Sequence, residues 1–128
     1  MKLLLDTHTF LWFIMGNSSL GSKARTAIED LANEKYVSVA SVWEIAIKVS
    51  IGKLSLSAPF SALIPDQLIA NGFELLNLEV AHAAALINLP FHHRDPFDRL
   101  LIAQAMVEQI QIVSIDSTFD AYPISRLW

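Results

Sequence analysis

The chain has 128 residues, of which 53% are hydrophobic and only 17% charged, and its formal net charge is −4. This length suits one domain with one hydrophobic core, which we expect to span residues 1–128. The acidic balance excludes the broad basic surface that binds nucleic acid on its own, and the absence of cysteine excludes disulfides and cysteine-based zinc sites.

Apolar residues are plentiful, but they are not arranged as a membrane span. No apolar run approaches the roughly 18 residues that a transmembrane helix needs. The first residues also lack the apolar stretch and cleavage site of a signal peptide. Together with the lack of cysteine, this favours a cytoplasmic protein without membrane contact. The surplus of apolar side chains predicts a surface buried against a second copy or another partner.

Short apolar runs typical of buried strands alternate with segments of helical periodicity along the first half of the chain. They predict a strand at 2–5, helices at 7–15 and 22–33, a strand at 35–40, and helices at 42–51 and 60–70. Pro65 is a potential break in the last of these helices.

The second half continues the same alternation. It predicts a strand at 73–78, helices at 80–89 and 96–109, a strand at 111–115, a helical turn at 118–121 and an edge strand at 123–128. Alternating strands and helices favour an α/β fold, here a three-layer α/β/α sandwich with a mainly parallel central sheet.

Two carboxylates, Asp95 and Asp98, stand three residues apart at the start of the helix predicted at 96–109. Pro96 suits the first helical position, and Asp95 directly before it can cap the free N–H groups of the first turn. Asp98 in that turn can either support the cap or point into a site. The choice depends on which other acids lie nearby.

Three further acids belong to the same edge of the predicted sheet. Asp6 and Asp116 follow the first and last buried strands, and Glu44 begins the helix after the second. Parallel strands end at one edge, where ligands of open α/β sheets bind. The helix of Asp98 leads into the strand before Asp116, so its N-terminus lies near that edge too.

Each acid also has a purely structural explanation. Ser41 and Glu44 fit a capping box, and Asp6 and Asp116 could cap the helices that follow them. As a group, however, the acids would repel one another unless a cation lay among them. Mg²⁺ and Mn²⁺ favour such oxygen ligands, and a divalent ion can activate water and polarise a phosphoryl oxygen. Phosphodiester hydrolysis without a protein nucleophile is therefore the natural reaction.

Four motifs extend this interpretation to a family. They are LLLDTHTFLWF at 3–13, SVASVWEIAIKVSIGKL at 38–54, HHRDPFDRLLIAQA at 92–105 and IVSIDSTFDAY at 112–122. In this order they resemble a PIN-domain ribonuclease, and within that group a VapC-type toxin of a toxin–antitoxin pair. The resemblance implies an endoribonuclease that is dependent on Mg²⁺ or Mn²⁺, forms a homodimer and is inhibited by a small cognate antitoxin. It implies metal ligands at Asp6, Glu44, Asp98 and Asp116.

Supporting roles are open to several neighbours of these acids. Ser114 could orient a carboxylate or a water or simply end its strand, and Thr7 is a weaker candidate of the same kind. Lys48 could pair with Glu44 four residues earlier or neutralise a substrate oxygen. The remaining candidates are Asp95 beside the site and the segment at 92–94, in which the histidines and Arg94 either contact phosphate or form a solvated loop.

Other functions compete with ribonuclease activity. A protein of the same fold could bind RNA without cleaving it. A receiver-like signalling domain would need a lysine late in the chain, and none follows Lys53. A phosphatase with an aspartyl nucleophile would need a second Asp where His8 stands. The tryptophans, Trp12, Trp43 and Trp128, are expected to be packing residues, with a stacking platform for bases as the alternative.

Overall fold

The computed structural model describes residues 1–128, which form five strands, six α-helices and one 3-10 helix. The strands are β1 (Lys2–Leu5), β2 (Glu34–Ser38), β3 (Phe73–Leu76), β4 (Gln111–Val113) and β5 (Arg126–Leu127). The helices are α1 (Thr7–Met15), α2 (Ser22–Glu29), α3 (Val39–Ser50), α4 (Phe60–Ala70), α5 (Val80–Ile87), α6 (Pro96–Glu108) and the 3-10 helix η1 (Ser117–Ala121).

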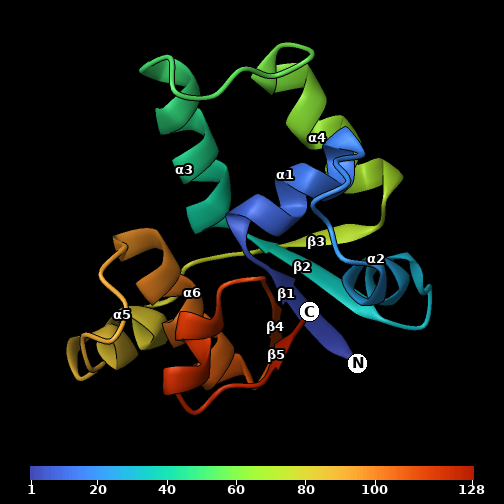
Figure 1. Ribbon diagram of the computed structural model, residues 1–128. Coiled ribbons are helices and arrows are strands. Elements are labelled where there is room, and N and C mark those ends of the chain that lie inside the picture. The colour runs from blue at the N-terminus through green and yellow to red at the C-terminus, as the bar shows by residue number, and fades with distance from the viewer.

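The strands form one sheet in the order β3-β2-β1-β4-β5, and every neighbouring pair is parallel. β1 is central, with Leu5 in register with Val37 on one side and Val113 on the other. Helices cover both faces of this sheet (Figure 1). The expected three-layer α/β sandwich with a parallel sheet is therefore confirmed.

The side chains of β1 divide the interior into two cores. Leu3 and Leu5 belong to a cluster that includes residues of α1, α2, α3 and α4, whereas Leu4 belongs to a second cluster with α6 and η1. All three leucines are fully buried. This alternation follows from the two-residue repeat of a strand, and it explains why an uninterrupted apolar run fits the middle of the sheet.

Several element boundaries differ from the sequence-based expectation. α2 ends at Glu29 because Asp30 begins a turn in which its carboxylate accepts the Ala32 N–H. β2 stops at Ser38, whose hydroxyl caps the next helix, so α3 begins three residues earlier than predicted. The edge strand β5 shrinks to two residues.

Pro65 does not interrupt α4, which keeps the predicted bounds. Its side chain lies on the exposed side of the helix, where water can satisfy the carbonyl that proline leaves without an N–H partner. No helix in the structure is both long enough and apolar enough to cross a bilayer.

Candidate active site

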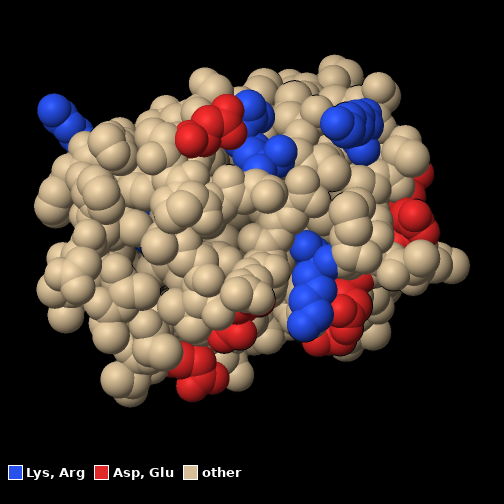
Figure 2. Space-filling model, turned by 90° about the horizontal axis from the view of Figure 1, so that it is seen from below, with Lys and Arg blue, Asp and Glu red and all other residues tan.

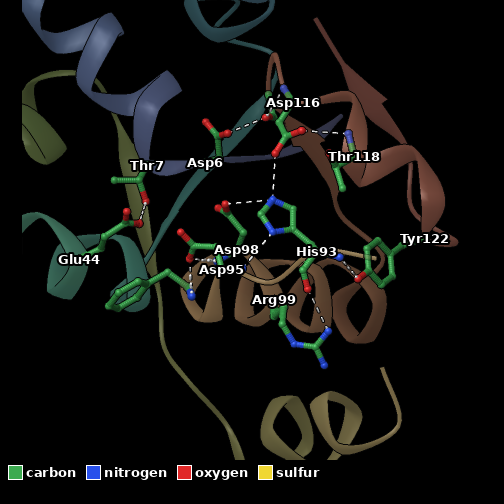
Figure 3. A network of polar contacts seen from close by, with 12 residues as sticks. Asp6, Thr7, Glu44, His93, Asp95, Asp98, Arg99, Asp116, Thr118 and Tyr122 are labelled. Carbon is green, nitrogen blue, oxygen red and sulfur yellow. Dashed lines mark hydrogen bonds and ion pairs between the residues drawn. The ribbon is translucent and has the colours of Figure 1, made fainter. Parts of the chain in front are cut away.

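The candidate site lies at the carboxyl edge of the sheet, where β1, β2 and β4 end. Asp6 follows β1, Asp116 follows β4, Glu44 lies on α3 after β2, and Asp98 lies in the first turn of α6. Figure 3 shows Asp6, Asp98 and Asp116 facing a common space, with Glu44 beside Thr7 at its margin. The predicted placement of acids from four elements at one edge is therefore what the structure contains.

Asp6 uses its two carboxylate oxygens for different purposes. Oδ1 accepts the Thr9 N–H at 2.9 Å and so caps α1, as the structural explanation expected. Oδ2 accepts a 2.6 Å hydrogen bond from the hydroxyl of Ser114, which is fully buried. The side chain of Asp6 is thus fixed from both sides at the end of the central strand.

Asp116 is held by three groups. Its backbone N–H donates to Ser114 Oγ at 3.0 Å, and its Oδ1 accepts the Thr118 N–H at 2.9 Å, which caps η1. Its Oδ2 lies 2.9 Å from Nε2 of His93. Burial acts to raise the pKa of Asp116, but the hydrogen bonds from Thr118 and His93 outweigh burial and lower it.

Glu44 does not take part in a capping box, so that explanation is wrong. The N-cap of α3 is Ser38, which places Glu44 in the second turn, out of reach of the helix start. The Glu44 carboxylate accepts from the Thr7 hydroxyl at 2.7 Å and pairs with Lys48 Nζ at 2.7 Å. The ion pair expected from the four-residue spacing is present, and Ser41 Oγ instead lies 3.0 Å from the Thr7 hydroxyl.

The two acids at the start of α6 have separate roles. Asp95 is the N-cap, with Oδ1 accepting the N–H groups of Phe97 at 2.8 Å and Asp98 at 3.2 Å. The Asp98 carboxylate caps nothing and points into the site. Desolvation by burial, followed by repulsion from Asp95, raises the pKa of Asp98 to about 7, against a smaller opposite effect of His93. Asp6 and Glu44 add to that repulsion.

His93 is the site residue that the sequence did not resolve. Its side chain is only 12% exposed, so the solvated-loop interpretation is wrong for this histidine. Nε2 lies 2.9 Å from Asp116 and 3.2 Å from Asp98, and one ligand atom from each of these three residues falls within a 4.8 Å group. Arg94, by contrast, is exposed and makes no side-chain hydrogen bond or ion pair.

The tightest group is therefore His93, Asp98 and Asp116, and Asp6 and Glu44 lie outside it. Asp6 is joined to this group through Ser114, and both outer acids raise the pKa of Asp98. Carboxylate oxygens predominate, and the negative charge among them is only partly balanced by Lys48. Such a donor set fits a hard divalent cation such as Mg²⁺ or Mn²⁺.

The tryptophans differ in their surroundings. Trp12 packs edge-on against Trp128, with ring centroids 6.0 Å apart, as expected of packing residues. Trp43, next to Glu44, is 57% exposed and meets Phe97 at the start of α6. Its ring therefore presents an aromatic surface beside the site.

A family model described as PIN domain matches residues 3–124. Over 63 residues the chain is 35% identical to Ribonuclease VapC16 of Mycobacterium tuberculosis (strain ATCC 25618 / H37Rv), a stretch that covers 49% of this chain and 45% of that protein. The match therefore spans less than half the length of that relative.

The structure also resembles several proteins of known structure. VapBC2 from Rickettsia felis, bound to a DNA fragment from its promoter, superposes with a TM-score of 0.75 at 15% identity, covering 99% of this chain and 98% of that one. FitAcB from Neisseria gonorrhoeae gives 0.64 at 18% identity, covering 98% and 96%. A toxin–antitoxin complex from Klebsiella pneumoniae gives 0.66 at 12% identity, also covering 98% and 96%. These likenesses establish a shared fold, and because the family model matches nearly the whole chain, the protein belongs to the PIN-domain family.

Proposed function

We propose that the protein is a Mg²⁺- or Mn²⁺-dependent endoribonuclease that acts as the toxin of a toxin–antitoxin pair. The observation that carries this proposal is the convergence of Asp6, Glu44, Asp98 and Asp116 at one sheet edge. The raised pKa of Asp98 supports it, because repulsion of this kind is relieved when a cation binds. The local identity to a protein named as a ribonuclease adds support.

In this proposal the four acids hold the cation. The chemistry that such an ion supplies when bound is activation of a water and neutralisation of charge on a phosphate. Ser114 orients Asp6, Thr7 orients Glu44, and Asp95 fixes the first turn from which Asp98 projects. Water, rather than a side chain, is the nucleophile, since the hydroxyls of Thr7 and Ser114 are buried and cannot reach a phosphate.

Local contacts must hold the RNA, because the chain is acidic overall. On the face shown in Figure 2, charged side chains form small groups among uncharged surface, and in some of these groups basic and acidic side chains lie side by side. We assign phosphate contacts to Lys48 and Arg94 beside the acids, and a base-stacking surface to Trp43. Binding to few cations should weaken as salt rises.

The partners we propose are a small antitoxin and a second copy of the chain. A solved structure of the same fold is described as a toxin–antitoxin complex, which supports the first. Large apolar side chains that remain exposed on the isolated chain support both, and Ile69, Val80 and Ile87 are each more than 80% exposed. Cellular RNA as substrate would place the protein in the cytoplasm.

The decisive experiment measures cleavage of a labelled single-stranded RNA with and without Mg²⁺ or Mn²⁺. Asp98→Asn is the best variant, because its carboxylate caps no helix and the change keeps the side-chain shape. Asp66→Asn, an exposed acid on α4, is the matched control. Wild type and control should cleave only with the divalent ion, and Asp98→Asn should not cleave.

The alternative is a module of the same fold that binds RNA and leaves it intact. A stable complex whose RNA keeps its original ends in the presence of Mg²⁺ and Mn²⁺ would favour it. Activity that persists in excess chelator would contradict the metal-dependent mechanism.

A further inference from the structure

The segment between α5 and α6, residues 88–95, places His93 in the acidic site. Two buried side chains from outside the segment hydrogen-bond to its backbone. The first is Arg99, which is only 6% exposed. Its guanidinium donates to the carbonyls of Leu89 at 3.0 Å, Pro90 at 2.9 Å and His93 at 3.3 Å. Burial of a guanidinium destabilises the folded state unless its N–H groups find acceptors. Here the acceptors are backbone carbonyls of this one segment.

The second is Tyr122, which is 4% exposed. Its hydroxyl donates to the Pro90 carbonyl at 2.7 Å and accepts the His93 N–H at 2.8 Å. One oxygen thus joins two backbone groups of the segment, and Figure 3 shows Tyr122 and Arg99 contacting it from different sides. A phenylalanine in place of Tyr122 would fill the same space and make neither bond.

The origin of these two side chains connects them to the acids. Arg99 follows Asp98 directly on α6, and Tyr122 ends the η1 turn that Asp116 begins. The helix that carries Asp98 therefore also supplies Arg99, and the turn that begins with Asp116 also supplies Tyr122. Both of these side chains hydrogen-bond to the backbone of His93. The relative positions of His93, Asp98 and Asp116 are consequently set by the same five hydrogen bonds.

The orientation of the His93 ring is fixed as well. Nδ1 accepts the backbone N–H of Asp95 at 3.2 Å, so the proton of the neutral ring is on Nε2. Nε2–H is then a donor to Asp116, at 2.9 Å, and lies 3.2 Å from Asp98. An imidazole in this state orients carboxylates, and it would have to give up the Asp95 bond to become a metal ligand through Nε2.

We propose that Arg99 and Tyr122 are positioning residues of the site, which act by holding His93 as an Nε2–H donor between Asp98 and Asp116. For activity, this inference rests on the proposed ribonuclease function. The placement and tautomer of His93 can be tested without it. A merely structural role for Arg99 and Tyr122 predicts lower stability and no effect specific to His93.

The first test uses NMR of the metal-free protein at a pH where imidazole is neutral, with nitrogen–proton correlations of the histidine rings. We expect His93 to show the Nε2–H tautomer in the wild type and mixed tautomers in Tyr122→Phe. Tyr36→Phe is the matched control, since the Tyr36 hydroxyl makes no hydrogen bond in the structure, and its His93 signals should equal those of the wild type. An unchanged His93 pattern in folded Tyr122→Phe would overturn the proposal.

The second test measures kinetics of RNA cleavage. Loss of the Tyr122 hydroxyl removes both of its hydrogen bonds to the segment and so disturbs the position of His93, which should lower kcat about tenfold and leave KM nearly unchanged. In a His93→Ala background, Tyr122→Phe should have no further effect on kcat, because it acts through the histidine. Independent, multiplying effects of the two changes would overturn the proposal.

Two controls keep the tests distinct. If Tyr122→Phe does not fold, Arg99→Lys takes its place, because lysine keeps the charge and loses the planar fork that reaches several carbonyls. If the wild type does not cleave RNA with either ion, the proposed function fails, and the NMR comparison still decides the positioning of His93.

Discussion

Ser114 joins the two acids at the ends of neighbouring strands: its hydroxyl donates to Asp6 Oδ2 at 2.6 Å and accepts the backbone N–H of Asp116 at 3.0 Å. A side chain of this size fits because β1 and β4 are adjacent and in register, with Leu5 opposite Val113. Because the register of β1 and β4 fixes the position of the Ser114 hydroxyl, the hydrogen bond from that hydroxyl fixes the orientation of the Asp6 carboxylate.

Removal of this hydroxyl should affect both stability and activity. Ser114→Ala leaves a buried carboxylate oxygen and a backbone N–H without their partner, which is expected to lower the free energy of unfolding by about 1–3 kcal/mol. Chemical denaturation measures this loss, with exposed Ser61→Ala on α4 as the control. At a temperature where both variants are folded, only Ser114→Ala should have reduced kcat, and equal activity would show that Asp6 needs no such support.

The metal-free protein should lose stability as the pH rises toward neutral because of Asp98. The pKa of Asp98 is raised from its ordinary value of 3.8 to about 7, so the folded state holds this proton more tightly than the unfolded state. The resulting penalty is absent below the lower value, grows between the two and is complete above the higher one. Urea denaturation in chelator at several pH values should show a smaller decline for Asp98→Asn than for the wild type. Parallel curves would contradict the raised pKa.

Divalent cations should reverse that penalty. Ion binding to the folded state alone adds about 2.7 kcal/mol when the free ion is at a hundred times its Kd. Thermal melting should therefore shift upward with Mn²⁺ in the wild type and in Asp66→Asn, and much less in Asp98→Asn. An equal shift in all three proteins would place the ion elsewhere.

Lys48 should contribute both to an ion pair with Glu44 and to the affinity for RNA. Lys48→Ala removes the ion pair with Glu44 and one cation beside the site, so RNA affinity should fall. The slope of log K against log salt should decrease in magnitude by about 0.7, as for one phosphate contact with a single strand. Lys23→Ala, on the exposed part of α2, should leave the slope unchanged. A slope equal to that of the wild type in Lys48→Ala would assign the lysine to Glu44 alone.

The sheet and the acids were predictable because their signals are local. A buried apolar run followed by an acid, as at Leu5 and Asp6, places a carboxylate at a strand end, and parallel strands share that end. The Asp95 cap is likewise encoded within three residues. These features require only the repeat of a strand or a helix and the direction of the chain.

The features that were missed depend on exact boundaries or on distant contacts. Ser41 was taken as a cap because the strand was expected to continue to Ala40, whereas β2 ends at Ser38, which itself caps the helix. The location of His93 depends on Asp116, 23 residues away, and on Tyr122, 29 residues away. No spacing along the chain reveals such contacts, because they exist only once the two segments are packed on the sheet.

The alternation of Leu3, Leu4 and Leu5 between two cores also limits which mutations in β1 this protein can accept during evolution. Loss or gain of one residue within β1 would send each of these leucines to the opposite core and would shift Asp6 away from Ser114 in the same step. Folding and chemistry would fail together, so no variant of this strand can preserve the scaffold while moving the carboxylate. Adjustment of the site is therefore left to the segments that surround β1, above all to the one that carries His93.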